Sequence, residues 1–391
     1  MNATELEALV NKARQETRRR LRAWIRRGVK VLGHRVGLSP AIDRLSSSSV
    51  VVLLYHKVQR RPTGLWGEPV LSVAEFDQHL THLARHHTLV PLAQVVKWLA
   101  GEASLPDRAV AITFDDGYRN NLLLAAPVLR RHRAPATFFV STGLIGTDRW
   151  MWAYELEEMF LRFSLPELGR AFGHPMMADL CGRGLPREVL LSACVDFLKT
   201  LEPREVEQLM ERLRRAAPVE VDDENRFLSW EEVRALHAMG FDIGGHGVTH
   251  SILVRQSLAD AEAEVAGCKE ALERELGRRP TLFAYPNGDT NARVSAMVGR
   301  HFSAAVTTVP SVCSRRNHLL ELPRVCAPVT VAELSFELTR HFFRDTRAGF
   351  AGAVNELRRD DASVRADLSP KSPAHRHERP PADPPRTTSA P

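Results

Sequence analysis

Cysteine is scarce in this chain of 391 residues, and the spacing of its five cysteines gives no disulfide framework. No two of them form a C-x-x-C pair. An odd number of scattered cysteines suits a reducing compartment, in which cysteine serves for packing. The five are Cys181, Cys194, Cys268, Cys313 and Cys326.

Long apolar runs are also absent. No segment is apolar over enough residues to span a bilayer, and the N-terminus has no apolar signal-peptide core. The default expectation is therefore a cytoplasmic protein, with membrane association as an alternative.

Several catalytic sequence motifs are absent. The sequence has no G-x-S-x-G elbow, and no Cys/His nucleophile arrangement stands out, so covalent acyl transfer is disfavoured. It has no glycine-rich phosphate loop either.

An excess of positive charge is confined to the N-terminus. Residues 1–36 contain ten Lys and Arg against three Glu, so the rest of the chain carries about −1 of the formal net charge of +6. Nucleic-acid binding by the whole protein is therefore not supported.

Residues 1–37 have the pattern of a basic amphipathic helix. Apolar residues from Leu21 to Val36 recur at steps of three and four, and arginines fill the other face. Such a helix can lie on an anionic membrane with Trp24 at the boundary, or pack its apolar stripe on the folded body. A serine run at 46–49 marks a linker, which makes residues 1–48 a first segment.

From residue 49 onward, expected strands and helices alternate, which predicts a parallel sheet and here a distorted (β/α) barrel of the α/β class. Capping boxes at 72–75 and 229–232 predict two helix starts. Further helices are expected at 92–99, 120–131 and 258–276, the last closed by Gly277. The expected strands are residues 50–54, 109–112, 136–140, 241–244, 281–285 and 304–308.

Two segments interrupt or end this alternation. Residues 148–228 are rich in Leu, Glu and Arg and predict a helical insertion. Trp150 and Trp152 at its start either stack on a ligand ring or pack in its core. Beyond residue 350 prolines accumulate, which predicts a disordered tail over 349–391. The barrel is therefore expected over 49–348.

Two adjacent carboxylates follow an expected buried strand. Asp115 and Asp116 come directly after the strand that begins at Ala109, and Gly117 ends the extended pattern. Ionised together they repel, so such a pair needs a metal, a shared proton or a strong donor nearby. The alternative is that one of them caps the following helix.

Two histidines follow a second expected strand. His246 and His250 are four residues apart in a glycine-containing turn, so their imidazoles can converge on one cation. Two His and one Asp leave positions open for water and substrate, which is the plan of a catalytic metal site. Surface histidines are the alternative for such a pair alone.

Three motifs occur in the order found in one enzyme family. Thr113-Phe-Asp-Asp-Gly117, His246-Gly-Val-Thr-His250 and Phe283-Ala-Tyr-Pro-Asn-Gly288 resemble the first three motifs of the polysaccharide deacetylases, the NodB-homology domains of carbohydrate esterase family four. The resemblance extends over roughly residues 50–340. Tyr55-His56-Lys57 resembles the entry strand of the branch found among bacterial exopolysaccharide and cell-envelope enzymes.

The resemblance implies a role for each matching position. It makes Asp116, His246 and His250 ligands of a divalent metal, and Asp115 the general base. The turn of Tyr285, Pro286 and Asn287 would contact the substrate, with a backbone N–H at Asn287 donating to the oxyanion. Zinc is the expected ion, with cobalt, nickel, manganese and iron as alternatives.

Two positions depart from the family pattern. Ala284 stands where many members have an arginine, and Arg324 either orients Asp115 in its place or forms a salt bridge at the barrel end. The late Leu-x-His motif has no clean match. His56 is the preferred general acid and His341 the alternative.

The resemblance implies a metal-dependent hydrolase that removes N-acetyl, or alternatively O-acetyl, groups from a bacterial envelope or extracellular glycan or its lipid-linked precursor. Two other hypotheses remain open at this point. One is an amide hydrolase acting on a non-glycan substrate, and the other is a catalytically silent carbohydrate-binding protein on the same fold.

Overall fold

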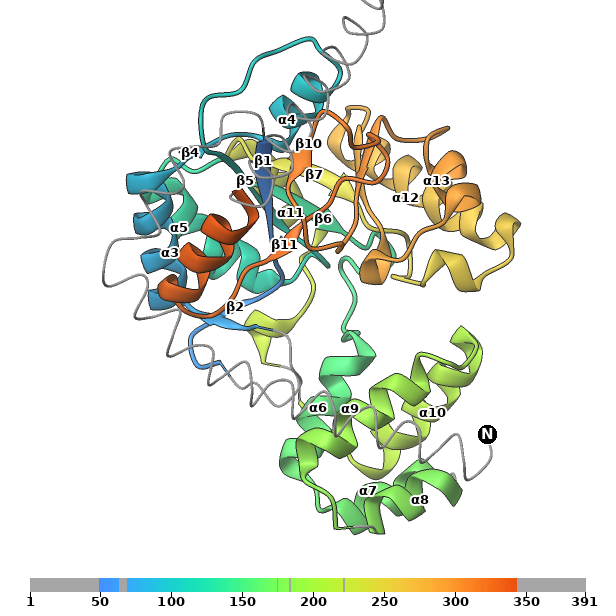
Figure 1. Cartoon of the computed structure of the whole chain (residues 1–391). Helices are drawn as coiled ribbons and strands as arrows, with labels where there is room; N and C mark the ends of the chain where they lie inside the picture. The colour runs from blue at the N-terminus through green and yellow to red at the C-terminus, as the bar shows by residue number, and fades with distance from the viewer. Residues whose placement is uncertain (1–48, 63–68, 174, 183, 221, 343–391) are drawn as a thin grey trace, which may run out of the picture. The chain divides into compact units, whose positions relative to one another are not determined.

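The computed structural model describes residues 49–342 except 63–68, 174, 183 and 221 (Figure 1). The expected helix of residues 1–37 and the expected tail of residues 349–391 lie outside the described residues.

In the described part of the chain, nine strands form one sheet (Figure 1). Its main path runs β10-β1-β5-β6-β7-β8-β9, with β4 beside β5 and β11 beside β1. Neighbours are parallel except for β10, which is antiparallel to β1. The strands are β1 Ser49–Tyr55, β4 Thr88–Leu89, β5 Ala109–Phe114, β6 Thr137–Val140, β7 Asp242–Gly245, β8 Leu282–Ala284, β9 Ala304–Val306, β10 Cys313–Ser314 and β11 Val325–Cys326; a separate pair is β2 Val58–Gln59 with β3 Leu71–Ser72.

The segment at residues 322–326 connects β9, at one end of this path, with β1, next to the other end. Leu322 bridges Val306 in β9, and Val325 pairs with Leu53 in β1. The sheet therefore curls back on itself, which confirms the expected distorted (β/α) barrel. The closing segment also places Arg324 between the first and last strands of the curl.

Small side chains on the inner face of the curl make room for larger ones. Ala111, Ala284 and Ala304 lie in one buried cluster with Phe139. A Cβ atom on Gly244 would come within 2.6 Å of the Phe139 ring, so this position accepts only glycine without a shift. Every residue of β1 and β5 is buried, as expected for parallel strands covered on both faces.

Helices cover the outside of the sheet, with α3 and α5 on one side and α12 and α13 on another (Figure 1). Both expected capping boxes are confirmed, at Ser72 and at Ser229, and α12 ends at Gly277 with φ +64° as expected. In the described part of the chain, no helix is both long and apolar enough to cross a membrane. The helices are α3 Val73–His86, α4 Leu92–Leu99, α5 Ala126–Arg131, α11 Trp230–Ala238, α12 Leu258–Leu276 and α13 Ala292–Val298, and residues 331–342 are also helical.

The expected helix at 120–131 differs at its start. Asn121–Ala125 form a π-helical turn, and α5 follows it. The buried side chain of Asn121 donates to the backbone carbonyl of His56 at 2.9 Å, which ties this turn to the end of β1. Such turns are frequent at functional sites.

Residues 152–216 form a layer of helices with a buried cluster of its own. Leu156, Phe160, Leu190 and Leu213 are fully buried in that cluster. Trp150 is buried and Trp152 is partly exposed. The helices are α6 Trp152–Arg162, α7 Leu165–Phe172, α8 Pro175–Gly182, α9 Arg187–Leu198 and α10 Pro203–Ala216.

Candidate active site

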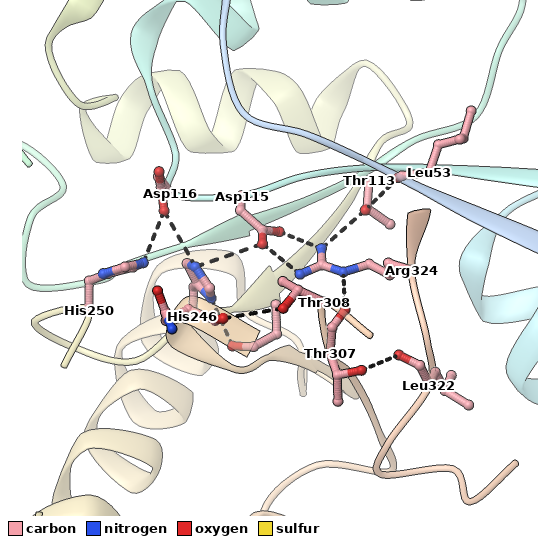
Figure 2. A network of polar contacts seen from close by, with 12 residues as sticks. Leu53, Thr113, Asp115, Asp116, His246, His250, Thr307, Thr308, Leu322 and Arg324 are labelled. Atoms are coloured by element: carbon pink, nitrogen blue, oxygen red, sulfur yellow. Dashed lines mark hydrogen bonds and ion pairs between the residues drawn. The ribbon is translucent and has the colours of Figure 1, made fainter. Parts of the chain in front are cut away.

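The ends of parallel strands bring the predicted residues together. Asp115 and Asp116 follow β5, and His246 follows β7, one strand beyond the intervening β6. Because the strands are parallel, their carboxyl ends meet at one edge of the sheet, which is where barrel enzymes have their sites. Figure 2 shows these side chains converging there with His250.

Asp116 and the two histidines form a group with the spacing of metal ligands. The Nε2 atoms of His246 and His250 lie 3.4 and 3.3 Å from Oδ1 of Asp116. The three ligand atoms are all within 4.8 Å of one another, and no other such group occurs among the described residues. Oδ1 of Asp116 is buried and has no hydrogen-bond partner there. A divalent cation fits this donor set of one carboxylate and two imidazoles.

The tautomer of His246 is set by the backbone. Its Nδ1 lies 2.8 Å from the carbonyl oxygen of Ala284, and since a carbonyl only accepts, Nδ1 carries the hydrogen. In the neutral ring, Nε2 then keeps its lone pair and can ligate a cation beside Asp116. A backbone acceptor behind a ligating histidine is the usual arrangement at metal sites.

Arg324 holds Asp115 in place from the opposite side. Its Nη1 and Nη2 donate to the two carboxylate oxygens at 2.7 Å each, and its Nε donates to the carbonyl of Thr307 at 2.9 Å (Figure 2). Nη1 also reaches the hydroxyl of Thr113 at 3.2 Å. The guanidinium is fully buried, so this planar double contact leaves Asp115 little freedom.

Charges around the two aspartates outweigh their burial. Burial alone would raise the pKa of Asp115, but Arg324 and His246 lower it, and the net shift is downward. Burial acts in the same way on Asp116, but His246 and His250 hold its pKa well below the ordinary value. Both carboxyl groups are therefore ionised near neutral pH.

Three residues of the site adopt backbone conformations that are uncommon outside glycine. Asp116, His250 and Asn287 have φ values of +75°, +61° and +61°. Such residues each cost on the order of 1–3 kcal/mol and persist only when surrounding contacts fix them. Their gathering at one edge of the sheet is typical of a functional site.

A cavity of about 290 Å³ opens over this group. His56 and Asn287 line it together with the two aspartates and the two histidines. The insertion contributes Trp152 and Lys199 to its wall. The cavity thus combines the metal-ligand set with an aromatic side chain and a cation.

Besides Arg324, which contacts Asp115 from behind the cavity wall, three predicted site residues do not line the cavity. The side chain of Tyr285 is buried against Phe283, and its hydroxyl donates to the carbonyl of Leu320 at 2.9 Å. Pro286 is buried and does not line the cavity. His341 is buried in the 331–342 helix, also off the cavity lining, with Nε2 3.8 Å from a carboxylate oxygen of Glu337.

Two side chains at the site were not found by sequence reasoning. Lys199 donates to Oδ1 of Asn287 at 2.9 Å across 88 residues of sequence. Glu264 on α12 accepts hydrogen bonds from the turn between the two histidines. Neither belongs to a motif, so no local signal in the sequence marks them.

The chain matches the family model described as polysaccharide deacetylase over residues 102–301. Its fold is similar to that of Streptococcus pyogenes deacetylase PplD in complex with acetate, at 18% identity and a TM-score of 0.51, over 75% of this chain and 99% of that one. It is also similar to IcaB from Ammonifex degensii, at 19% identity and a TM-score of 0.49, over 76% of this chain and 98% of that one. No curated protein matches the chain.

The family match spans about half of the chain and contains the aspartate pair and both histidines. The chain therefore belongs to the polysaccharide deacetylase family, and it is a glycan deacetylase that acts on non-peptide carbon–nitrogen bonds.

Proposed function

We propose that this protein is a metal-dependent hydrolase that removes N-acetyl groups from a bacterial envelope or exopolysaccharide glycan, or from its lipid-linked precursor. The observation that carries the proposal is the Asp116, His246 and His250 group beside the paired Asp115, all at the floor of one cavity. O-acetyl groups are the alternative substrate within the same chemistry.

Asp116, His246 and His250 would hold a divalent metal, with zinc the expected ion and cobalt, nickel, manganese or iron as alternatives. A metal bound there would polarise the acetamide carbonyl and lower the pKa of water. The backbone contact of His246 at Nδ1 supports this assignment, because it leaves Nε2 available.

Asp115 is the proposed general base. It is ionised and held by Arg324, so it can accept the proton of the attacking water without turning away. Arg324 acts on the reaction through Asp115, as a positioning residue. Arg324 would thus take the role of the arginine that many family members have at the position of Ala284.

His56 is the proposed general acid, which would transfer a proton to the nitrogen of the departing amine. It lines the cavity and is close enough to influence the pKa of both aspartates, whereas His341 is off the cavity lining. A backbone N–H at Asn287 would donate to the oxyanion. Tyr285 and Pro286 would shape this turn from behind rather than touch substrate.

The test is acetate release from a panel of N-acetylated and O-acetylated glycans. The chain would be stripped of metal by chelation and reloaded with one ion at a time. Asp115→Asn should abolish release while zinc still binds, because the metal ligands are untouched. Asp107→Asn is the matched control, since Asp107 is exposed and outside the cavity. Release that survives complete metal removal would contradict the proposal.

Residues 1–37 are proposed to bring the enzyme to an anionic membrane surface from a cytoplasmic location. The basis is their charge pattern: residues 1–36 hold ten basic residues against three acidic ones. Binding of the full chain and of a chain lacking residues 1–37 to vesicles with and without anionic lipid tests this. Equal binding of the two chains would contradict it.

A further inference from the structure

The turn between the two candidate histidine ligands is held on one side by the loop after β6. The carbonyls of Gly247 and Val248 accept hydrogen bonds from the N–H groups of Thr142 and Gly143, at 3.0 and 2.8 Å. A Cβ atom on Gly143 would come within 2.7 Å of the Val248 side chain, so glycine is needed for this approach. Because N–H and C=O point in opposite directions across a trans peptide bond, the N–H groups of this turn face the other way.

On that side, the N–H groups of the turn donate hydrogen bonds to one carboxylate. Oε2 of Glu264 accepts from the backbone N–H groups of Val248 and Thr249, at 2.9 Å each. Its Oε1 accepts from the Thr249 hydroxyl at 2.7 Å. A carboxylate suits this place because both oxygens accept hydrogen bonds and neither donates.

The close approach also depends on Gly247. Its φ is +78°, and a Cβ atom there would lie 3.1 Å from Oε2 of Glu264. Glu264 stands on α12, which is anchored by the buried Ala261 and Val265 on either side of it. The carboxylate is therefore fixed to a packed helix rather than to a mobile loop.

The end of the turn needs such support. His250 has φ +61° without being a glycine, and its imidazole is 20% exposed, so core packing alone does not fix it. Its Nε2 must nevertheless stay near Oδ1 of Asp116, from which it lies 3.3 Å. The hydrogen bonds to Glu264 hold the backbone immediately before it from one side, and those from the loop after β6 hold it from the other.

We propose that Glu264 is a positioning residue for the metal ligands. Its carboxylate fixes the backbone of residues 247–249. This keeps His250 close enough to Asp116 for both to bind one metal ion, already in the metal-free protein. The inference rests on the proposed function, since it concerns the affinity of the Asp-His-His group for a metal.

The test measures metal binding rather than turnover. The full chain and its variants, stripped by chelation, are titrated with Zn²⁺ alone by calorimetry and with Co²⁺ alone by visible absorption, which reports ligand geometry. Glu264→Ala should weaken Zn²⁺ binding about 10–100-fold and alter the Co²⁺ spectrum. Glu264→Gln should stay within roughly threefold of wild type, because its amide oxygen can accept from both backbone N–H groups.

Glu270→Gln is the matched control. Glu270 is exposed on the same helix, so this change removes a similar charge without touching the turn. Its Zn²⁺ affinity should equal that of wild type. Thr249→Val removes the hydroxyl contacts to Oε1 of Glu264 and to Oγ of Ser251 but keeps both backbone N–H contacts, and should weaken binding roughly threefold with the fold intact. Thr249→Val replaces Glu264→Ala in the binding test if Glu264→Ala fails to fold.

The outcomes separate the two proposals. If the wild-type chain binds neither Zn²⁺ nor Co²⁺, the proposed function fails and this inference fails with it. If wild type binds and folded Glu264→Ala binds equally well, only the positioning role is overturned. Equal losses in Glu264→Ala and Glu264→Gln would also overturn it, because charge rather than hydrogen bonding would then be responsible. If Glu264→Ala does not fold, a Zn²⁺ affinity of Thr249→Val equal to that of wild type would overturn the positioning role.

Discussion

Arg324 and Asp115 form a doubly hydrogen-bonded ion pair, with both distances 2.7 Å, across 209 residues of sequence. The pair is buried, and the segment that carries Arg324 lies between the first and last strands of the curled sheet. Sheet closure and the orientation of the proposed base therefore depend on the same few residues.

Breaking this pair should cost stability. In Arg324→Met the Asp115 carboxylate is left buried without its partner, so the free energy of unfolding should fall by about 3–5 kcal/mol. Urea unfolding of the metal-free protein measures this. Adding Asp115→Asn to Arg324→Met should recover part of the loss, because no buried charge then remains. Strictly additive effects of the two changes would show that the pair is not coupled.

Arg324→Lys should fold better than Arg324→Met but should not restore activity. An ammonium group keeps the charge yet cannot donate to both oxygens of Asp115 in one plane. The kcat for acetate release should fall roughly tenfold or more, with KM nearly unchanged, because the proposed base is misaligned while the cavity stays intact. Wild-type kcat in this variant would contradict the positioning role.

Removal of one proposed ligand should abolish tight metal binding without unfolding the chain. His250 is 20% exposed, so His250→Ala leaves the core intact. Its Zn²⁺ affinity should fall by more than the roughly 10–100-fold that loss of a supporting contact costs. His318→Ala is the control, since His318 is exposed and does not line the cavity. Similar Zn²⁺ affinity in both variants would rule out His250 as a ligand.

His79 should make the fold sensitive to mild acid. It is buried, its Nδ1 accepts from the Tyr55 hydroxyl at 3.2 Å, and its Nε2 donates to the Val329 carbonyl at 3.1 Å. Burial lowers the pKa of His79 from 6.5 to about 4. The unfolded chain therefore binds more protons between these pH values. The free energy of unfolding should fall as pH drops from 6.5 to 4, by up to about 3 kcal/mol.

Urea unfolding of wild type and His79→Gln at several pH values measures this contribution. Glutamine can accept and donate but does not titrate, so the variant should lose less stability as the pH falls. Other buried histidines, such as His87, whose pKa burial lowers to about 3, act equally on both proteins. A constant difference in stability from pH 6.5 to 4 would contradict the prediction.

Lys199 should matter for turnover although it belongs to the insertion. Its hydrogen bond to Oδ1 of Asn287 stabilises a turn in which Asn287 has φ +61°. Loss of a bond from a charged donor in Lys199→Met should reduce kcat/KM about tenfold. Lys97→Met is the control, because Lys97 is exposed on α4 and does not line the cavity. Equal kcat/KM in both variants would show that Lys199 is dispensable.

Local patterns in the sequence predicted much of the fold and part of the site. The strands, the two capping boxes and the glycine that ends α12 follow from short-range rules, because the residues that decide them are neighbours in sequence. The Asp115 and Asp116 pair and the two histidines were found for the same reason. Parallel pairing then brought them to one edge.

Side-chain direction at the strand ends was decided by the tertiary structure. Ala284 and Tyr285 are adjacent, but alternation along a strand turns successive side chains to opposite faces. Ala284 lies in the cluster inside the curl and Tyr285 in the cluster with Phe283 outside it. The family motif names both positions and does not say which face each one takes.

Contacts between distant segments could not be read from the sequence at all. The sequence left Arg324 undecided between Asp115 and a salt bridge at the barrel end, and only the closing segment settles the contact. Lys199 reaches Asn287, and Glu264 reaches Thr249, through the packing of helices whose own sequences specify only an apolar face. The chain alone determined which chemical groups are present and where the strands end. The closure of the sheet and the packing of helices on it determined which groups are in contact. Such contacts depend on how distant segments pack together, which local sequence rules do not specify.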